Sequence, residues 1–220
     1  MTIQKQSRDR LVKLSKFDLF SDATPFGKTI TMKRENCGED AVIFVCGFRS
    51  RIGWCGLVGR DAVVYQVLIG HPSLDSVIQS AFRYCEKNVV PETMKVAHWN
   101  TQLQQKIKAY TEGVPLEFND VELKIFSKTS FCAKVLSATR LIGYGSTTSY
   151  GELARHVGHP GAARAVGTVM SMNRFPIVIP CHRVLAAGGR LGGYTSPVGI
   201  PMKKILLEME ERSLSVTNSP

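Results

Sequence analysis

The stretch TSYGELARHVGHPGAARAVGTVMSMN, residues 148–173, predicts two short helices joined by a tight turn. Ser149 suits the N-cap of the first helix, and Glu152 three residues later completes a capping box. Glycine and proline interrupt the helical pattern at 158–161, and a second helix rich in small residues is expected over 162–172. Such a pair is a helix-turn-helix, whose second helix usually enters a groove of DNA.

The first half of the chain has a different pattern, typical of a small sheet. Turn residues separate three runs rich in β-forming residues, which predict an antiparallel meander: AVIFVCGF at 41–48, IGWCGLVG at 52–59 and DAVVYQVLIG at 61–70. Helical patterns follow at about 74–84 and 99–111, and EGVPLEFND at 112–120 is the best candidate for a linker.

These patterns predict an α/β (α+β) fold in two domains. A small antiparallel-sheet domain over 41–120 is followed by a mostly helical domain over 121–220 that contains the helix-turn-helix. A further helix is expected from the capping residues Thr129 and Ser130 to a stop at Gly143. Residues 1–40 are expected to form a weakly ordered basic extension.

The basic charge of the chain lies mainly in its second half. The 220 residues carry a formal net charge of +10, and residues 121–220 hold 12 lysines and arginines against 5 acidic residues, a net of +7. No acidic residue lies between Glu152 and Glu208. A segment of this charge attracts polyanions such as DNA, although a solvated basic face is the simpler alternative.

Membrane and secretory segments are not evident in the sequence. No apolar run reaches the roughly 20 residues of a membrane helix, so we predict a soluble protein with no membrane partner. Asp9 and Asp18 argue against an organellar presequence in the basic N-terminal stretch. A DNA-binding protein of this kind is expected in the cytoplasm or nucleoid of a prokaryote, or in the nucleus of a eukaryote.

Six cysteines without regular spacing indicate reduced thiols. A structural zinc site in the first domain would draw on Cys37, Cys46, Cys55 and Cys85 with His71 or His98, but no C-x₂₋₄-C pair occurs among them. We therefore interpret these cysteines as small buried hydrophobic residues, and we expect that no metal or other cofactor is required.

Cys181 differs because His182 and Arg183 follow it directly. A neighbouring cation or imidazole favours the reactive thiolate. Adjacent residues of a strand point to opposite faces, so the chain must bend at Pro180 for the pair to share a site, with a water to carry the proton. Residues 121–220 contain no aspartate, which leaves Glu208 or Glu210 to orient the imidazole.

Four motifs in order and spacing identify a resemblance. IPCHRV behind Asn173, with SYGELA and AARAVG upstream and GGYTS downstream, resembles the O6-alkylguanine-DNA alkyltransferases, also called methylated-DNA–protein-cysteine methyltransferases. The similarity is dense over 129–210, looser over 41–120 and absent from the first 40 residues. It implies a single-turnover DNA repair protein that flips O6-alkylguanine out of duplex DNA and transfers the alkyl group irreversibly to its own cysteine.

The resemblance also implies the catalytic roles. Cys181 would accept the alkyl group, and His182 would act as its base through a water. Glu210, rather than Glu208, would hold the histidine, and Asn173 would brace the turn that carries the cysteine. Tyr150 would protonate guanine N3, so that the base leaves neutral.

Contacts with DNA follow in the same way, and a monomer is expected to bind the damaged duplex through the minor groove. Arg164 would fill the gap left by the flipped nucleotide, because chemistry on a base requires its extrusion. Ala163 and Gly167 would let the helix backbone approach the phosphates. His159 stands where an asparagine is common in the family, so the phosphate contact expected there differs.

The resemblance places the substrate pocket after the cysteine. Tyr194 and Thr195 would line it, and the backbone of Val184 would read the base. Ser196 and Pro197 replace glycines that are usual in the family, and the loop has two residues more before the final helix. A side chain and a fixed φ in place of glycine predict a pocket that accepts methyl readily and disfavours benzyl.

Three other functions are consistent with parts of the sequence. A lesion-binding module without activity would lack the acceptor cysteine, which is present here. A transcription factor would need long base-reading side chains at the start of the second helix, where the sequence is Gly161-Ala162-Ala163. A redox-sensing thiol protein would need a second cysteine close to Cys181, and the sequence leaves that open.

Overall fold

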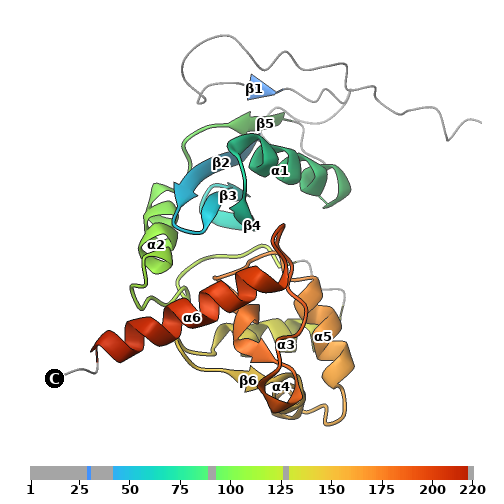
Figure 1. Cartoon of the computed structure of the whole chain (residues 1–220). Helices are drawn as coiled ribbons and strands as arrows, with labels where there is room; N and C mark the ends of the chain where they lie inside the picture. The colour runs from blue at the N-terminus through green and yellow to red at the C-terminus, as the bar shows by residue number, and fades with distance from the viewer. Residues whose placement is uncertain (1–28, 31–41, 89–92, 126–128, 218–220) are drawn as a thin grey trace, which may run out of the picture.

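The structure is a computed structural model, and it describes residues 29–30, 42–88, 93–125 and 129–217. In Figure 1 a sheet with two helices lies above a group of helices formed by the second half of the chain. The sheet has five strands in the order β1-β5-β2-β3-β4. They are β1 (Thr29–Ile30), β2 (Val42–Ser50), β3 (Gly53–Arg60), β4 (Val63–His71) and β5 (Thr93–Val96).

The predicted antiparallel meander is confirmed by the pairing of β2 with β3 and of β3 with β4. Strand β5 was not predicted, because four residues are too short to show a period. It pairs parallel with β2 and antiparallel with β1. Strand β1 belongs to the stretch 1–40; the rest of that stretch lies outside the described residues, so its expected weak order stays a prediction.

One helix packs on each face of the sheet, because neighbouring residues of a strand point to opposite faces. Val45 packs in the apolar cluster that contains Val77 of α1 (Leu74–Asn88), whereas Cys46 packs in the cluster that contains Ile107 of α2 (Thr101–Thr111).

Both of these helices differ from the predicted bounds at one end. Helix α1 continues to Asn88, four residues past the expected end. Helix α2 begins two residues later than expected, because Asn100 caps it in the left-handed region with φ 49°, and its side chain accepts from the backbone N–H of Leu103.

The helix-turn-helix of the second half is confirmed. The helices there are α3 (Ser130–Arg140), α4 (Tyr150–His156), α5 (Ala163–Ser171) and α6 (Ile200–Thr217). Both hydrogen bonds of the Ser149–Glu152 capping box are present. Helix α3 ends at Arg140 with Leu141 as its C-cap, before the stop expected at Gly143.

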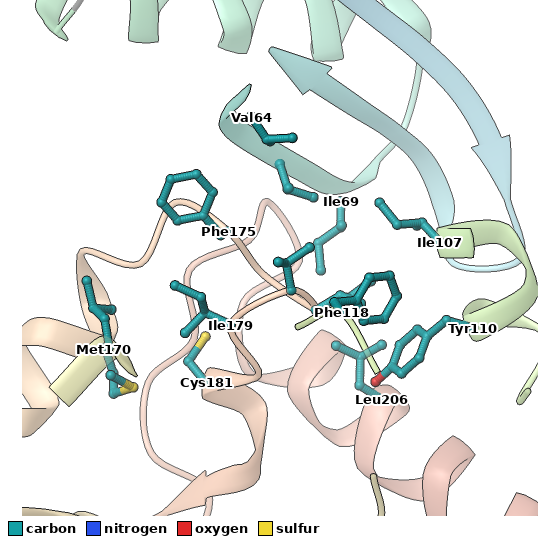
Figure 2. Packing of buried hydrophobic residues seen from close by; sticks show 14 of the residues in the cluster. Val64, Ile69, Ile107, Tyr110, Phe118, Met170, Phe175, Ile179, Cys181 and Leu206 are labelled. Atoms are coloured by element: carbon teal, nitrogen blue, oxygen red, sulfur yellow. The ribbon is translucent and has the colours of Figure 1, made fainter. Parts of the chain in front are cut away.

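A single apolar cluster joins the sheet to these helices. It contains Ile107 of α2, Val135 of α3 and Leu206 of α6, and Figure 2 shows part of it around Phe118. The backbone N–H of Val67 in β4 also donates to the carbonyl of Arg174, at 2.8 Å. Residues 112–125 lie between α2 and α3, and Val64 of β4 exchanges backbone hydrogen bonds with Glu122 and Lys124. The chain on both sides of residue 120 thus belongs to a shared core, and the use of that residue as a domain boundary stays a prediction. No described helix is long and apolar enough to cross a membrane.

Candidate active site

The turn that carries Cys181 is held by one buried asparagine. Asn173 donates from Nδ2 to the carbonyl of Ile179 at 2.8 Å and to Sγ of Cys181 at 3.1 Å. Its Oδ1 accepts from the backbone N–H of Phe175 at 3.0 Å. Ile177, inside this turn, has φ 71°, which is rare for a β-branched residue and indicates a backbone strained by its surroundings.

Cys181 begins a single 3₁₀ turn, Cys181–Arg183, that follows Pro180, and the chain bends here as the sequence predicts. The thiol is buried, with 5% of the residue exposed. Burial raises the pKa of Cys181, against the hydrogen bond from Asn173 and the charge of Lys203, which lower it. The acceptor is therefore a neutral thiol until a base removes its proton.

His182 is fully buried between two side chains from distant parts of the chain. Its Nε2 lies 3.0 Å from Oε1 of Glu210 and 3.1 Å from the hydroxyl of Tyr110. Burial lowers the pKa of His182, although the hydrogen bond and charge of Glu210 raise it. Its Nδ1 has no hydrogen-bond partner in the part of the chain that the structure describes.

Glu210 is the carboxylate that contacts this histidine, whereas Glu208 is exposed and pairs with Lys204 at 3.6 Å. Burial raises the pKa of Glu210, but the hydrogen bonds and charges of His182 and Arg183 together lower it to about 2. Arg183 donates from Nη2 to Oε1 at 2.8 Å and from Nε to both carboxylate oxygens, at 3.1 and 3.2 Å. The backbone N–H of Gly145 donates to Oε2 at 3.0 Å.

Tyr150 is the first residue of α4 and lies beside a buried lysine. Lys203 is fully buried, donates from Nζ to the carbonyl of Val184 at 2.6 Å and lies 5.7 Å from the centre of the Tyr150 ring. Burial, and then the charge of Cys181, raise the pKa of Tyr150, so its hydroxyl keeps its proton. A Cβ atom at Gly192 would overlap that hydroxyl, so any larger residue there would require the Tyr150 ring to move.

The expected pocket residues are found in different settings. Burial and the charge of Cys181 raise the pKa of Tyr194 well above its usual value, and its buried hydroxyl has no partner among the described residues. Thr195 donates to the carbonyl of Ser171 at 2.8 Å. The hydroxyl of Ser196 accepts from the backbone N–H of Gly199 at 3.0 Å, so it closes the turn before α6.

The residues expected to contact DNA lie on the surface of the helix-turn-helix. Arg164, in the first turn of α5, is exposed, as is His159, whose ring packs edge-on against Phe131 with 5.0 Å between centroids. Ala163 is half-buried, and a Cβ atom at Gly167 would meet nothing within 4 Å. The small residues thus leave open space along α5.

No group of three or more His, Cys, Asp or Glu side chains in the described ranges is arranged to hold a metal ion. Cys46, Cys55 and Cys85 are buried in the apolar clusters, and burial raises the pKa of Cys46 to about 12. Cys37 lies outside the described residues, so the expectation that zinc is not required stays a prediction.

Sequence reasoning did not assign a role to Tyr110, Lys203 or Gly192. It took Arg183 as a cation that favours the thiolate of Cys181, whereas the guanidinium of Arg183 donates to the carboxylate of Glu210. The position of Arg183 beside His182 was a signal that it could share the same carboxylate. Tyr110 gave no such signal, because 72 residues separate it from His182.

Comparison with known proteins agrees with this geometry. A family model described as "6-O-methylguanine DNA methyltransferase, DNA binding domain" matches residues 130–212. The methylated-DNA–protein-cysteine methyltransferase of Mycobacterium leprae is 40% identical over 151 residues, which cover 67% of this chain and 87% of that protein. The protein of the same name from Mycobacterium tuberculosis is 47% identical over 106 residues, 48% of this chain, and the match spans only 62% of that relative's length.

Solved structures of the same group share the fold. The crystal structure of Mycobacterium tuberculosis OGT in complex with DNA has a TM-score of 0.62 and 32% identity, and the match covers 77% of this chain and 94% of that one. The O6-methylguanine-DNA methyltransferase of Pyrococcus kodakaraensis has a TM-score of 0.60 and 30% identity, with 76% and 98% covered. The motifs, the buried Cys–His–Glu arrangement and these matches agree: the chain belongs to the methylated-DNA–protein-cysteine methyltransferase family.

Proposed function

We propose that the protein is a single-turnover DNA repair transferase that moves the alkyl group of O6-alkylguanine in duplex DNA to its own Cys181. The observation that carries this proposal is the setting of the thiol. A single buried asparagine holds its sulfur, and the next residue is a buried histidine paired with a carboxylate. Family membership supports the same reaction.

The residues of this chain account for every atom and electron pair that moves in the transfer. The sulfur of Cys181 attacks the carbon attached to O6, an S–C bond forms, and the C–O bond breaks with its electron pair left on the guanine. The Tyr150 hydroxyl is protonated before the transfer, and it donates this proton to N3, so the base leaves neutral. The thiol proton goes to His182, and a proton then returns through water from the imidazolium to the Tyr150 phenolate, so no cofactor enters the balance.

The buried polar groups support the path of that proton. His182 Nδ1 has no partner within the described ranges, which suits a bridging water from the thiol. Glu210 stays ionised, because its pKa is held near 2, and so stabilises the imidazolium that forms. Glu210 and His182 would thus share the cost of ionising a buried thiol.

The surface of the helix-turn-helix supports binding of duplex DNA through the minor groove. Helix α5 offers small side chains and the exposed Arg164, which would occupy the space of the extruded nucleotide. Tyr194, Thr195, Ser196 and the Val184 backbone would surround the flipped base. A monomer is sufficient for this arrangement, and the protein would act in the nucleoid of a prokaryote or the nucleus of a eukaryote.

The experiment is to incubate the protein with duplex DNA that carries labelled O6-methylguanine and to locate the label by peptide mass. We expect one label per molecule, on Cys181, because a thioether has no easy leaving path. Cys181→Ala should abolish transfer and still bind the DNA. Repeated turnover at sub-stoichiometric protein, or label on another residue, would contradict the proposal.

A further inference from the structure

Tyr110 reaches the active site from the other half of the molecule. It lies in α2, beside the sheet, and is fully buried. Its hydroxyl donates to Oε1 of Glu210 at 2.5 Å and lies 3.1 Å from Nε2 of His182. Figure 2 shows the Tyr110 oxygen directed away from α2 and toward α6 near Leu206.

The protons of this cluster can be assigned from its geometry. The Tyr110 hydroxyl has one hydrogen, and it donates this hydrogen in a hydrogen bond to the ionised Glu210 at 2.5 Å. Its oxygen then faces Nε2 of His182 as an acceptor, and Glu210 Oε1 faces the same nitrogen as a second acceptor. A nitrogen between two acceptors must carry the hydrogen, so Nδ1 holds the lone pair of the neutral imidazole.

We propose that Tyr110 is a positioning residue for alkyl transfer, which keeps Nδ1 of His182 as the basic nitrogen and stabilises the imidazolium that forms there. This inference rests on the proposed function of the site. The tyrosine oxygen is an acceptor that the imidazolium keeps when it takes the thiol proton. The contact also matters because Arg183 donates two hydrogen bonds to Glu210 Oε1. The carboxylate oxygen is therefore a weaker hydrogen-bond acceptor for His182 than it would be alone.

Among the described charged groups around the two reacting groups, Glu210 accepts a hydrogen bond from the Tyr110 hydroxyl. His182 is also faced by Glu210, Arg183 and Lys203. The groups that face Cys181 are Asn173, Lys203, Tyr150 and Tyr194. Removing only the hydroxyl therefore removes one contact of His182 and the hydrogen bond from Tyr110 to Glu210.

Tyr110→Phe tests the inference, because the ring and its edge-on packing against Phe118 at 5.7 Å are kept. The readout is the rate at which iodoacetamide modifies Cys181 as a function of pH, followed by peptide mass with Cys132 as the internal reference. In Tyr110→Phe we expect the rise of the modification rate to occur at higher pH than in the unchanged protein. A displacement of one pH unit would lower the rate near neutral pH by about tenfold. At high pH, where the thiol ionises without a base, the two proteins should react alike.

Tyr144→Phe is the matched control. Tyr144 packs edge-on against Tyr110 with 5.8 Å between centroids, and its hydroxyl donates to the carbonyl of Gly113 at 3.2 Å. Burial raises the pKa of Tyr144 and the charge of Glu210 contributes to this rise, but the hydroxyl does not donate to that carboxylate among the described contacts. We expect its pH profile to match that of the unchanged protein. A purely structural role of Tyr110 would lower the rate by the same factor at every pH, or lower only the melting temperature, and either result would overturn the inference.

A second measurement does not depend on whether the variant folds. The ¹⁵N shifts of His182 in the unchanged protein at neutral pH should show hydrogen on Nε2 and a lone pair on Nδ1. Hydrogen on Nδ1 would refute the assignment. Neither measurement uses alkylated DNA, so failure of the proposed function, seen as absent transfer from O6-methylguanine, is distinguishable from failure of this inference.

Discussion

One amide nitrogen, Nδ2 of Asn173, holds both the sulfur of Cys181, at 3.1 Å, and the carbonyl of Ile179, at 2.8 Å. The position of the acceptor and its readiness to ionise thus depend on the same side chain. A donor to sulfur favours the thiolate, and this hydrogen bond lowers the pKa of Cys181 against the effect of burial.

Asn173→Ala should therefore weaken both the fold and the reactivity of the thiol. The backbone N–H of Phe175 would lose its Oδ1 acceptor, and the carbonyl of Ile179 would keep only the backbone N–H of Cys181 as a donor. These losses should lower the free energy of unfolding by about 1–3 kcal/mol, measured by urea denaturation. The pKa of Cys181 should rise further, measured by the pH dependence of its modification. Asn173→Asp keeps the acceptor for the backbone N–H of Phe175 but replaces the donor with a carboxylate, so its thiol should be the least reactive. An Asp variant as reactive as the unchanged protein would contradict this role.

Acid should destabilise the protein through Glu210 and His182. The folded pKa of Glu210 is lowered from 4.5 to about 2, so its contribution is complete above pH 4.5 and is lost as the pH falls toward 2. That difference corresponds to about 3 kcal/mol. The pKa of His182 is lowered mainly by burial, so the unfolded chain takes up this proton first, and stability falls below about pH 6.5.

Urea denaturation at a series of pH values checks this prediction. Glu210→Gln should remove the part of the acid loss that belongs to Glu210 and leave the part that belongs to His182. It should cost about 3–5 kcal/mol at neutral pH because Arg183 is left without its buried partner. Glu208→Gln is the control and should change little, because Glu208 is exposed and pairs with Lys204 on the surface. A Glu210→Gln protein with an unchanged acid limb would show that another group titrates.

Arg164→Ala should slow the repair of duplex DNA far more than reaction with the free base O6-benzylguanine. Only the duplex needs a nucleotide extruded, at a cost of a few kcal/mol, so a loss of more than about tenfold is expected on duplex DNA alone. Single-turnover rates on both substrates measure this. Arg155→Ala is the control, because it removes the same charge from an exposed position on α4. Its effects on the rates with the two substrates should be much more alike. Equal losses for Arg164→Ala on both substrates would refute the role of Arg164 in extrusion.

Ser196→Gly should widen the range of alkyl groups accepted. Relief of a steric mismatch worth about 1–3 kcal/mol would raise the rate with O6-benzylguanine by about 10- to 200-fold and leave the methyl rate unchanged. Ser196→Ala is the control, because it loses the hydroxyl that accepts from Gly199 but keeps the Cβ atom. Both variants should lose stability, and only glycine should gain the benzyl reaction. An unchanged benzyl rate in Ser196→Gly would rule out Ser196 as the limit of the pocket.

Local rules were sufficient where the structure is local. The capping box at Ser149 and Glu152, the meander and the bend at Pro180 each depend on a few neighbouring residues, and all three are present. The contact of Glu210 with His182 followed from the resemblance, since spacing alone left Glu208 open. The helix ends were less predictable, because caps such as Asn100 in the left-handed region depend on one backbone angle.

Contacts between distant parts of the chain could not be predicted from one sequence. Tyr110 lies in a helix of ordinary amphipathic pattern and lies 100 residues before Glu210, so nothing local marks it. Lys203 has the character of a solvent-facing helical lysine, yet it is fully buried with its ammonium on the carbonyl of Val184. Strand β5 is placed by its pairing with β2, since four residues carry no periodic signal.

The pairing of β1 with β5 has a consequence for the behaviour of the protein in concentrated solution. An outermost strand exposes a row of unpaired N–H and C=O groups that can recruit a strand of another molecule. Here Thr29 and Ile30 occupy that position by pairing with Lys95 and Met94. A chain shortened past Ile30 would keep its acceptor thiol and its helix-turn-helix. It would, however, expose β5 as an edge strand that can pair with a strand of another molecule. Its solutions should then form aggregates at concentrations where the full chain does not.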